Sequence, residues 1–129
     1  MTKEIKSYDN DTIAAIATAQ GDGGIAVIRV SGAKTTEIIK DIFSKDKNST
    51  KPIEMKSHHM YHGHIVDSAS DKIVDEVLCV QMKSPNSYTG EDMAEIHSHG
   101  GHLVPKKILS LLFKLGVRPA NPGEFTLRA

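Results

Sequence analysis

Residues 11–30, DTIAAIATAQGDGGIAVIRV, point to the fold class, because they predict two β-strands joined by a glycine-rich loop. Residues 11–18 are small, apolar and β-branched, and residues 25–30 return to an apolar, β-branched pattern. The glycines between them can adopt the positive φ angles that a tight connection requires. We therefore expect a pair of strands at the start of the domain.

Three more strands are expected further along the chain. Residues 58–66 and 77–82 have an extended pattern, and the polar residues 67–72 between them have the composition of a turn. We predict that these two strands pair as a hairpin. Residues 94–98 form the last expected strand, which ends at two glycines.

Apolar periodicity predicts two helices. In the first, which Ser31 can cap, apolar residues recur at helical spacing over residues 38–43. The second has Gly116 at a position suited to the residue after its last turn. Its single apolar stripe consists of Val104, Ile108, Leu111, Leu112 and Leu115. The element order indicates an α+β fold with a mixed β-sheet of about five strands and two or three helices.

The segment Asn121-Pro-Gly-Glu124 predicts the opening of a further helix. Asn would stand at the N-cap, Pro at the first helical position and a carboxylate at the third. The chain stops at Ala129, short of the roughly 12 residues that an isolated helix needs to be stable. We therefore expect residues 121–129 to begin a helix that continues in a longer protein.

Composition limits the class of protein. The 129 residues fit one domain, and 16 Lys and Arg residues balance 16 Asp and Glu residues, which argues against nucleic-acid binding by bulk charge alone. Cys79 is the single cysteine, so no internal disulfide can form. Residues 1–10 form a polar tail without the apolar core of a signal peptide, and no apolar run reaches membrane-spanning length. We expect a cytoplasmic protein that does not contact a membrane.

The glycines are the first candidate binding residues. The loop Gly21–Gly24 could present backbone N–H groups to an anion, but it lacks the P-loop pattern and precedes a strand, so a plain turn is favoured. Gly100-Gly101 precedes a helix, where an anion site and close backbone packing are both open. No nucleotide-hydrolysing motif occurs in the chain.

The seven histidines are the second candidate. His97 and His99 would share one face of a strand, as would His62 and His64, and neutral imidazoles are good zinc ligands. No HExxH motif and no cysteine pair supports a metal site. Surface or half-buried histidines in hairpins are the favoured interpretation, with a zinc-binding domain as the weaker hypothesis.

Arg29 and Glu95 are the third candidate. Strand alternation places Arg29 on the same face as Ile25 and Val27, where a guanidinium held against apolar side chains needs a partner. The two side chains could form a structural salt bridge. Alternatively, they could face a cleft and recognise a planar polar ligand, since a carboxylate matches the amino-pyrimidinone edge of a pterin.

Six motifs in a fixed order resemble one family, the N-terminal domains of the MnmE/TrmE tRNA uridine-5-carboxymethylaminomethyl modification GTPases. The similarity runs from about Asp11 to Ala129 and is carried by these blocks: Asp11-Thr-Ile-Ala-Ala-Ile-Ala-Thr18, Gly21-Asp-Gly-Gly24, Arg29-Val-Ser-Gly32, Pro85-Asn-Ser-Tyr-Thr-Gly-Glu-Asp92, His99-Gly-Gly101 and Asn121-Pro-Gly-Glu-Phe-Thr126. The blocks that contain Tyr88 and Phe125 are specific to the family, and five or more such blocks in the same order are highly specific.

The resemblance implies a function. Full-length members carry a helical domain and a G domain that uses GTP, Mg and K, and with MnmG/GidA they modify the wobble uridine of tRNA. Their N-terminal domain resembles the folate-binding domains of the glycine-cleavage T-protein group, binds 5-formyltetrahydrofolate and forms a homodimer. Residues 11–120 would be this folate-binding and dimerisation domain, and residues 121–129 would lead into the helical domain.

Residue by residue, the resemblance places the family's folate-contacting arginine and glutamate on Arg29 and Glu95. It assigns no catalytic residue and no metal ligand to this chain. Two departures concern the glycine loop: Ala19-Gln20 stand where the family usually has two prolines, and Asp22 stands where a basic residue is common. A dimerisation module without ligand binding remains the alternative.

Overall fold

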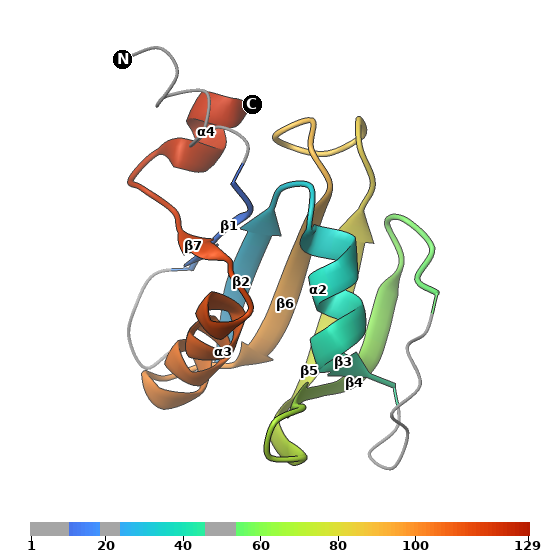
Figure 1. Cartoon of the computed structure of the whole chain (residues 1–129), viewed down its shortest axis with the longest axis vertical. Coiled ribbons are helices and arrows are strands. Elements are labelled where there is room, and N and C mark those ends of the chain that lie inside the picture. The colour runs from blue at the N-terminus through green and yellow to red at the C-terminus, as the bar shows by residue number, and fades with distance from the viewer. Residues whose placement is uncertain (1–10, 19–23, 46–53) are drawn as a thin grey trace.

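The computed structural model describes residues 11–18, 24–45 and 54–129. Within these residues one mixed sheet of seven strands has the order β3-β4-β5-β6-β2-β1-β7 (Figure 1). The predicted N-terminal tail and the expected contacts of the loop residues 19–23 lie outside the described residues. The α+β prediction is therefore confirmed, with a wider sheet than expected.

The elements follow the chain in the order expected for most of its length. Their bounds are β1 Ile13–Ile16, β2 Ile25–Ser31, α2 Thr35–Ile42, β3 Phe43–Ser44, β4 Met60–Asp67, β5 Lys72–Met82, β6 Met93–His99, α3 Leu103–Lys114, β7 Arg118–Pro119 and α4 Glu124–Arg128. The predicted hairpin is the antiparallel pair β4–β5, and the predicted first strand pair is β1–β2, also antiparallel.

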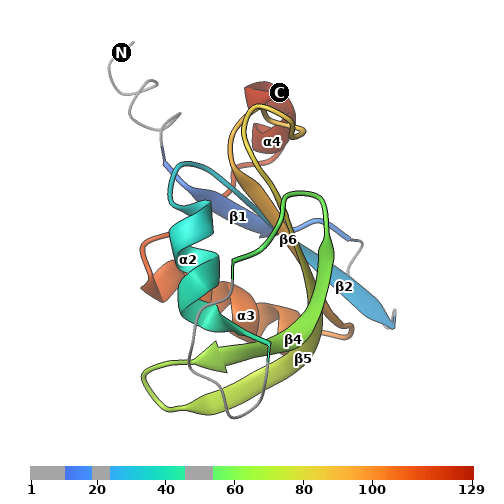
Figure 2. The same ribbon diagram turned by 90° about the vertical axis from the view of Figure 1, so that its right-hand side faces the viewer.

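Strand β2 shows why the sheet has a buried face and an open face. Ala26, Ile28 and Val30 are buried, whereas Ile25, Val27 and Arg29 between them are more exposed. Helices α2 and α3 lie against the buried face, and the sheet curls around them (Figure 2). The apolar stripes predicted for the helices supply their side of the core: Ile38, Ile39, Ile42, Ile108, Leu111 and Leu112.

The strand count is a correction: the sheet has seven described strands where about five were predicted. The two unexpected strands, β3 and β7, are two residues long and therefore carry no readable alternation. Strand β7 pairs in parallel with β1, which makes the sheet mixed. Three helices are described, within the expected number.

Both predicted N-terminal helix caps are wrong, whereas Gly116 follows the C-cap Leu115 of α3 with a φ of 95°, as predicted. Ser31 is the buried last residue of β2, and α2 starts three residues later than Gly32 because the chain first makes a turn there. Helix α4 starts at Glu124 after Gly123, which has a φ of 75°. The Glu124 carboxylate still accepts a hydrogen bond from the Asn121 N–H at 2.8 Å, so the expected side-chain contact forms without the expected helical turn.

Candidate functional site

Arg29 and Glu95 are brought together on the open face of the sheet. They stand directly opposite each other in the antiparallel pair β2–β6. The guanidinium donates through Nη2 at 3.0 Å and Nε at 3.2 Å, both to Glu95 Oε2. The salt bridge predicted as one alternative is therefore present, and the ligand-binding role of the two residues stays a prediction.

Arg29 shares a strand face with Ile25 and Val27, as predicted, and this face is the open one. Its side chain is 30% exposed and that of Glu95 is 21% exposed. Ile25, on the same face, is 66% exposed, because both core helices cover the other face of the sheet. The ion pair is consequently reachable from solvent, which a ligand site requires.

Glu95 has a second hydrogen-bond partner on its own strand. His97 Nε2 lies 3.1 Å from Oε1, the oxygen that Arg29 does not contact. Partial burial alone would raise the pKa of Glu95, but the hydrogen bonds and charges of His97 and Arg29 outweigh this effect and lower the pKa below its ordinary value. Glu95 is therefore an ionised hydrogen-bond acceptor at neutral pH.

Two aromatic rings complete the surroundings of the Arg29 guanidinium. Its Cζ lies 6.0 Å from the centre of the Tyr88 ring and 5.8 Å from that of Phe125, within the range of cation–π attraction. The Tyr88 hydroxyl is hydrogen-bonded to Thr126 of α4 at 3.1 Å. Sequence reasoning missed both rings as site residues, because a loop and a short helix give no periodic signal.

A buried charged network holds α4 and the β5–β6 loop at this end of the sheet. Glu124 accepts hydrogen bonds from Arg118 Nη2 at 2.6 Å and from Arg128 Nη2 at 3.0 Å. Arg128 Nη1 also donates to Glu91 at 3.1 Å, and Ser31 donates to the same carboxylate at 2.8 Å. The network thereby fixes the segments that carry Tyr88 and Phe125 relative to β2.

The seven histidines do not form one cluster of potential metal ligands among the described residues. His62 pairs with Glu76 at 2.8 Å, and His99 pairs with Asp75 at 2.8 Å, each on the sheet surface. His64 is buried, and neither of its ring nitrogens has a hydrogen-bond partner among the described residues. No group of three or more His, Cys, Asp or Glu residues that could hold a metal ion occurs in residues 11–18, 24–45 and 54–129.

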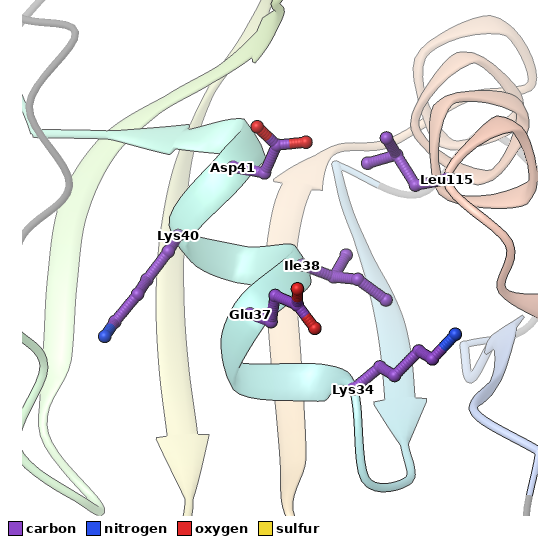
Figure 3. A pocket seen from close by; sticks show the side chains of 6 residues that line it. All are labelled: Lys34, Glu37, Ile38, Lys40, Asp41 and Leu115. Atoms are coloured by element: carbon purple, nitrogen blue, oxygen red, sulfur yellow. The ribbon is translucent and has the colours of Figure 1, made fainter.

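Two of the grooves formed by the described residues bear on the site. One of about 300 Å³ adjoins the Glu95 region on the open face and is lined by residues that include Ile25, His62, Glu76, Leu78, His97 and His99. The other, of about 470 Å³, lies between α2 and α3 on the helical side, away from the Arg29–Glu95 pair (Figure 3). Its lining carries two lysines and two carboxylates over Ile38 and Leu115, so its charges balance.

The glycine pair before α3 shows a conformational role. Gly101 has a φ of 82°, and a Cβ placed there would meet nothing within 4 Å. Positive φ, and not close backbone packing, therefore explains this glycine. Gly100 donates its N–H to the Gly24 carbonyl at 3.0 Å, which ties the end of β6 to the start of β2.

No helix among the described residues has both the length and the apolar character needed to cross a membrane.

The comparison with known families matches residues 12–129 to the family described as "GTP-binding protein TrmE N-terminus".

Relatives with curated descriptions extend this match. The chain is 51% identical over 122 residues to a tRNA modification GTPase MnmE from Alkaliphilus oremlandii, which covers 95% of this chain and 26% of that protein. It is 52% identical over 119 residues to the protein of the same description from Natranaerobius thermophilus, covering 92% and 25%. The Geobacter sulfurreducens protein is 45% identical over 122 residues. The chain thus spans about a quarter of the length of these relatives.

Proposed function

The chain belongs to the TrmE N-terminal domain family, and on this premise we propose that it is the 5-formyltetrahydrofolate-binding and homodimerisation domain of a tRNA modification GTPase. The observation that carries the ligand proposal is the solvent-reachable ion pair of Arg29 and Glu95 on the open face.

Glu95 supplies hydrogen-bond acceptors for the pterin. A carboxylate has about four acceptor positions, and three hydrogen bonds from Arg29 and His97 are made to it by the described residues. The remaining position lies on Oε1. The ligand's amino-pyrimidinone edge would use this position first and would take a second one if Arg29 gives up one of its two bonds to Oε2.

Arg29 and Tyr88 supply the other contacts. A guanidinium can recognise a carbonyl of the ligand with directed N–H donors. The Tyr88 ring is half exposed, so one of its faces is available to a planar ring system. Because the charged network anchors α4, Phe125 holds the guanidinium from a second direction.

Homodimerisation is proposed for the same open face. Strand pairing places Ile25, Leu78 and Met60 on this face, and all three side chains are exposed. Exposed apolar side chains spread over one sheet face favour association with a second copy.

The activity of the whole protein is a proposal that goes beyond this chain. We propose that GTP hydrolysis with Mg and K belongs to a G domain elsewhere in the protein. We further propose that the protein acts in the cytoplasm with MnmG/GidA on the wobble uridine of tRNA. The balanced charge of the chain supports only limited tRNA contact by this domain.

Replacing Glu95 with glutamine tests the ligand site. The expected result is a loss of affinity for 5-formyltetrahydrofolate of about 1.5–3 kcal/mol, because a charge-assisted hydrogen bond to the pterin becomes a neutral one. Isothermal titration calorimetry measures this loss. Glu76→Gln is the matched control, since Glu76 also pairs with a histidine on the same face but lies outside the proposed contacts.

Two calorimetric results would reject the ligand site. One is the absence of binding to the wild-type chain. The other is equal affinity in wild type and Glu95→Gln. Binding that weakens equally in the two glutamine variants would also contradict a specific role of Glu95.

Replacing Ile25 with aspartate tests the dimer. We expect the monomer fraction at a given concentration to rise at least tenfold, because a charge would be buried in the apolar contact. Sedimentation equilibrium measures the association constant. Phe113→Asp, on α3 and away from the open face, is the control. A wild-type chain that is monomeric at high concentration would refute this part of the proposal, and a dimer that gives no folate response would favour the module without a ligand.

A further inference from the structure

We propose that His97 is a positioning residue for the folate site: it holds the free oxygen of the Glu95 carboxylate and thereby fixes the plane in which that carboxylate meets the ligand. The inference rests on the proposed function, because it concerns the same ligand. It goes beyond that function by assigning a role to a residue that does not itself need to touch the heterocycle.

The Arg29–Glu95 ion pair alone does not fix the orientation of the Glu95 carboxylate. Both Arg29 donors, Nε and Nη2, bind the same oxygen, Oε2. Two contacts at one oxygen hold that atom but leave the carboxylate free to turn about it. The His97 Nε2 contact at 3.1 Å reaches the other oxygen, so the two partners together define the carboxylate plane.

The remaining charged groups near His97 have partners of their own. Across the face, His97 stands opposite Val27 of β2 and Leu78 of β5. On the neighbouring positions His99 is bound by Asp75, and His62 is bound by Glu76. Glu95 is thus the carboxylate within hydrogen-bonding distance of the His97 ring among the described residues.

Partial burial makes the His97–Glu95 hydrogen bond stronger than one on a fully exposed surface. The His97 side chain is 28% exposed, and apolar side chains of the groove flank it on both neighbouring strands. A hydrogen bond to a charged oxygen is stronger where water is partly excluded. Orientation matters because the proposed ligand presents two N–H groups in one plane, and a tilted carboxylate aligns with only one of them.

The experiment compares two substitutions at position 97 by titration calorimetry with 5-formyltetrahydrofolate. His97→Leu keeps an apolar side chain of similar bulk but removes the donor, and we expect about a tenfold loss of affinity. His97→Gln keeps an N–H donor, and we expect it to bind within about threefold of wild type.

A double-mutant cycle separates positioning from a general structural role. In a Glu95→Gln background, His97→Leu should cause less than about a twofold further loss, because the residue acts through the carboxylate that has been removed. Wild-type affinity in His97→Leu, equal weakness of the Leu and Gln variants, or an undiminished loss in the Glu95→Gln background would each overturn the inference while leaving the proposed function standing. A wild-type chain that does not bind would overturn both.

Discussion

Replacing Gly32 with alanine is expected to lower the free energy of unfolding by about 4 kcal/mol, because the substitution adds backbone strain and a steric clash at one position. Gly32 has a φ of 142°, in the region that L-residues rarely adopt. A Cβ at this position would lie 2.5 Å from the Cα of Thr12 and 2.6 Å from its Oγ1.

Neither Gly32 nor Thr12 can move away without losing backbone hydrogen bonds. The Gly32 N–H donates to the Asp92 carbonyl at 2.9 Å, which ties it to the start of β6. Thr12 accepts from the Arg118 N–H through its carbonyl at 2.9 Å and from the Lys34 N–H through Oγ1 at 3.0 Å. The clash would therefore be relieved only by breaking hydrogen bonds at the same end of the sheet as the proposed ligand site.

Alanine substitutions at two other glycines measure the backbone strain and the steric clash separately. Gly116 has a φ of 95° with open space around a Cβ, so Gly116→Ala measures strain alone and should cost about 1 kcal/mol. Gly63 is not among the positive-φ glycines, but its Cβ would lie 2.4 Å from the Ser44 carbonyl oxygen, so Gly63→Ala measures the clash, about 2–3 kcal/mol. Urea unfolding followed by circular dichroism gives all three values. A cost for Gly32→Ala no larger than that for Gly116→Ala would contradict the close contact with Thr12.

Replacing Glu124 with glutamine is expected to cost about 3 kcal/mol of stability at pH 7, because two largely buried guanidinium groups lose their shared carboxylate. The side chains of Glu124 and Arg128 are 7% and 5% exposed. Arg118 and Arg128 keep their contacts with Asp11 and Glu91, so the loss is smaller than for an isolated buried charge.

The effect should depend on pH in a defined direction. Burial alone would raise the pKa of Glu124, but Arg118, the Asn121 N–H and Arg128 outweigh it and lower the pKa below the ordinary value of 4.5. A carboxyl group with a lowered pKa in the folded state contributes stability above its unfolded pKa and loses it as the pH falls through the folded pKa. The difference between wild type and Glu124→Gln should therefore be constant near neutral pH and shrink below pH 4.5.

Chemical denaturation at several pH values between about 7 and 3 measures this difference. Glu95 also has a lowered pKa, but it is present in both proteins and its contribution cancels. Glu37→Gln is the control, because Glu37 is exposed on α2 and makes no ion pair with a described residue. A gap that stays the same down to pH 3 would show that the Glu124 charge does not stabilise the fold.

The extent of agreement between sequence and structure differs from element to element. Helix α3 was predicted within one residue at each end, since its apolar stripe and Gly116 are local signals. Strands β3 and β7 were missed, because two residues carry no alternation and their pairing partners lie far along the chain. The Asn121 cap was wrong because Gly123 takes a left-handed φ of 75°, so the helix begins only at Glu124.

The sequence likewise predicted some features of the candidate site and missed others. Strand alternation and the family motifs selected Arg29 and Glu95, and pairing of β2 with β6 put them directly opposite each other. The same alternation placed Arg29 on the face of Ile25 and Val27 but could not tell which face of the sheet the helices would cover; this face is the open one, and the Arg29 side chain is 30% exposed.

Local chemistry along the chain was sufficient for the α+β class, the long helix and the two charged residues, because periodicity and turn composition act over a few neighbouring positions. Long-range packing alone decided that Tyr88 and Phe125 lie beside the Arg29 guanidinium, and that Arg128 reaches Asp11 and Glu91 at the end of the sheet. These contacts join segments that are up to 117 positions apart in sequence, and only closure of the core around β2 and β6 brings them together.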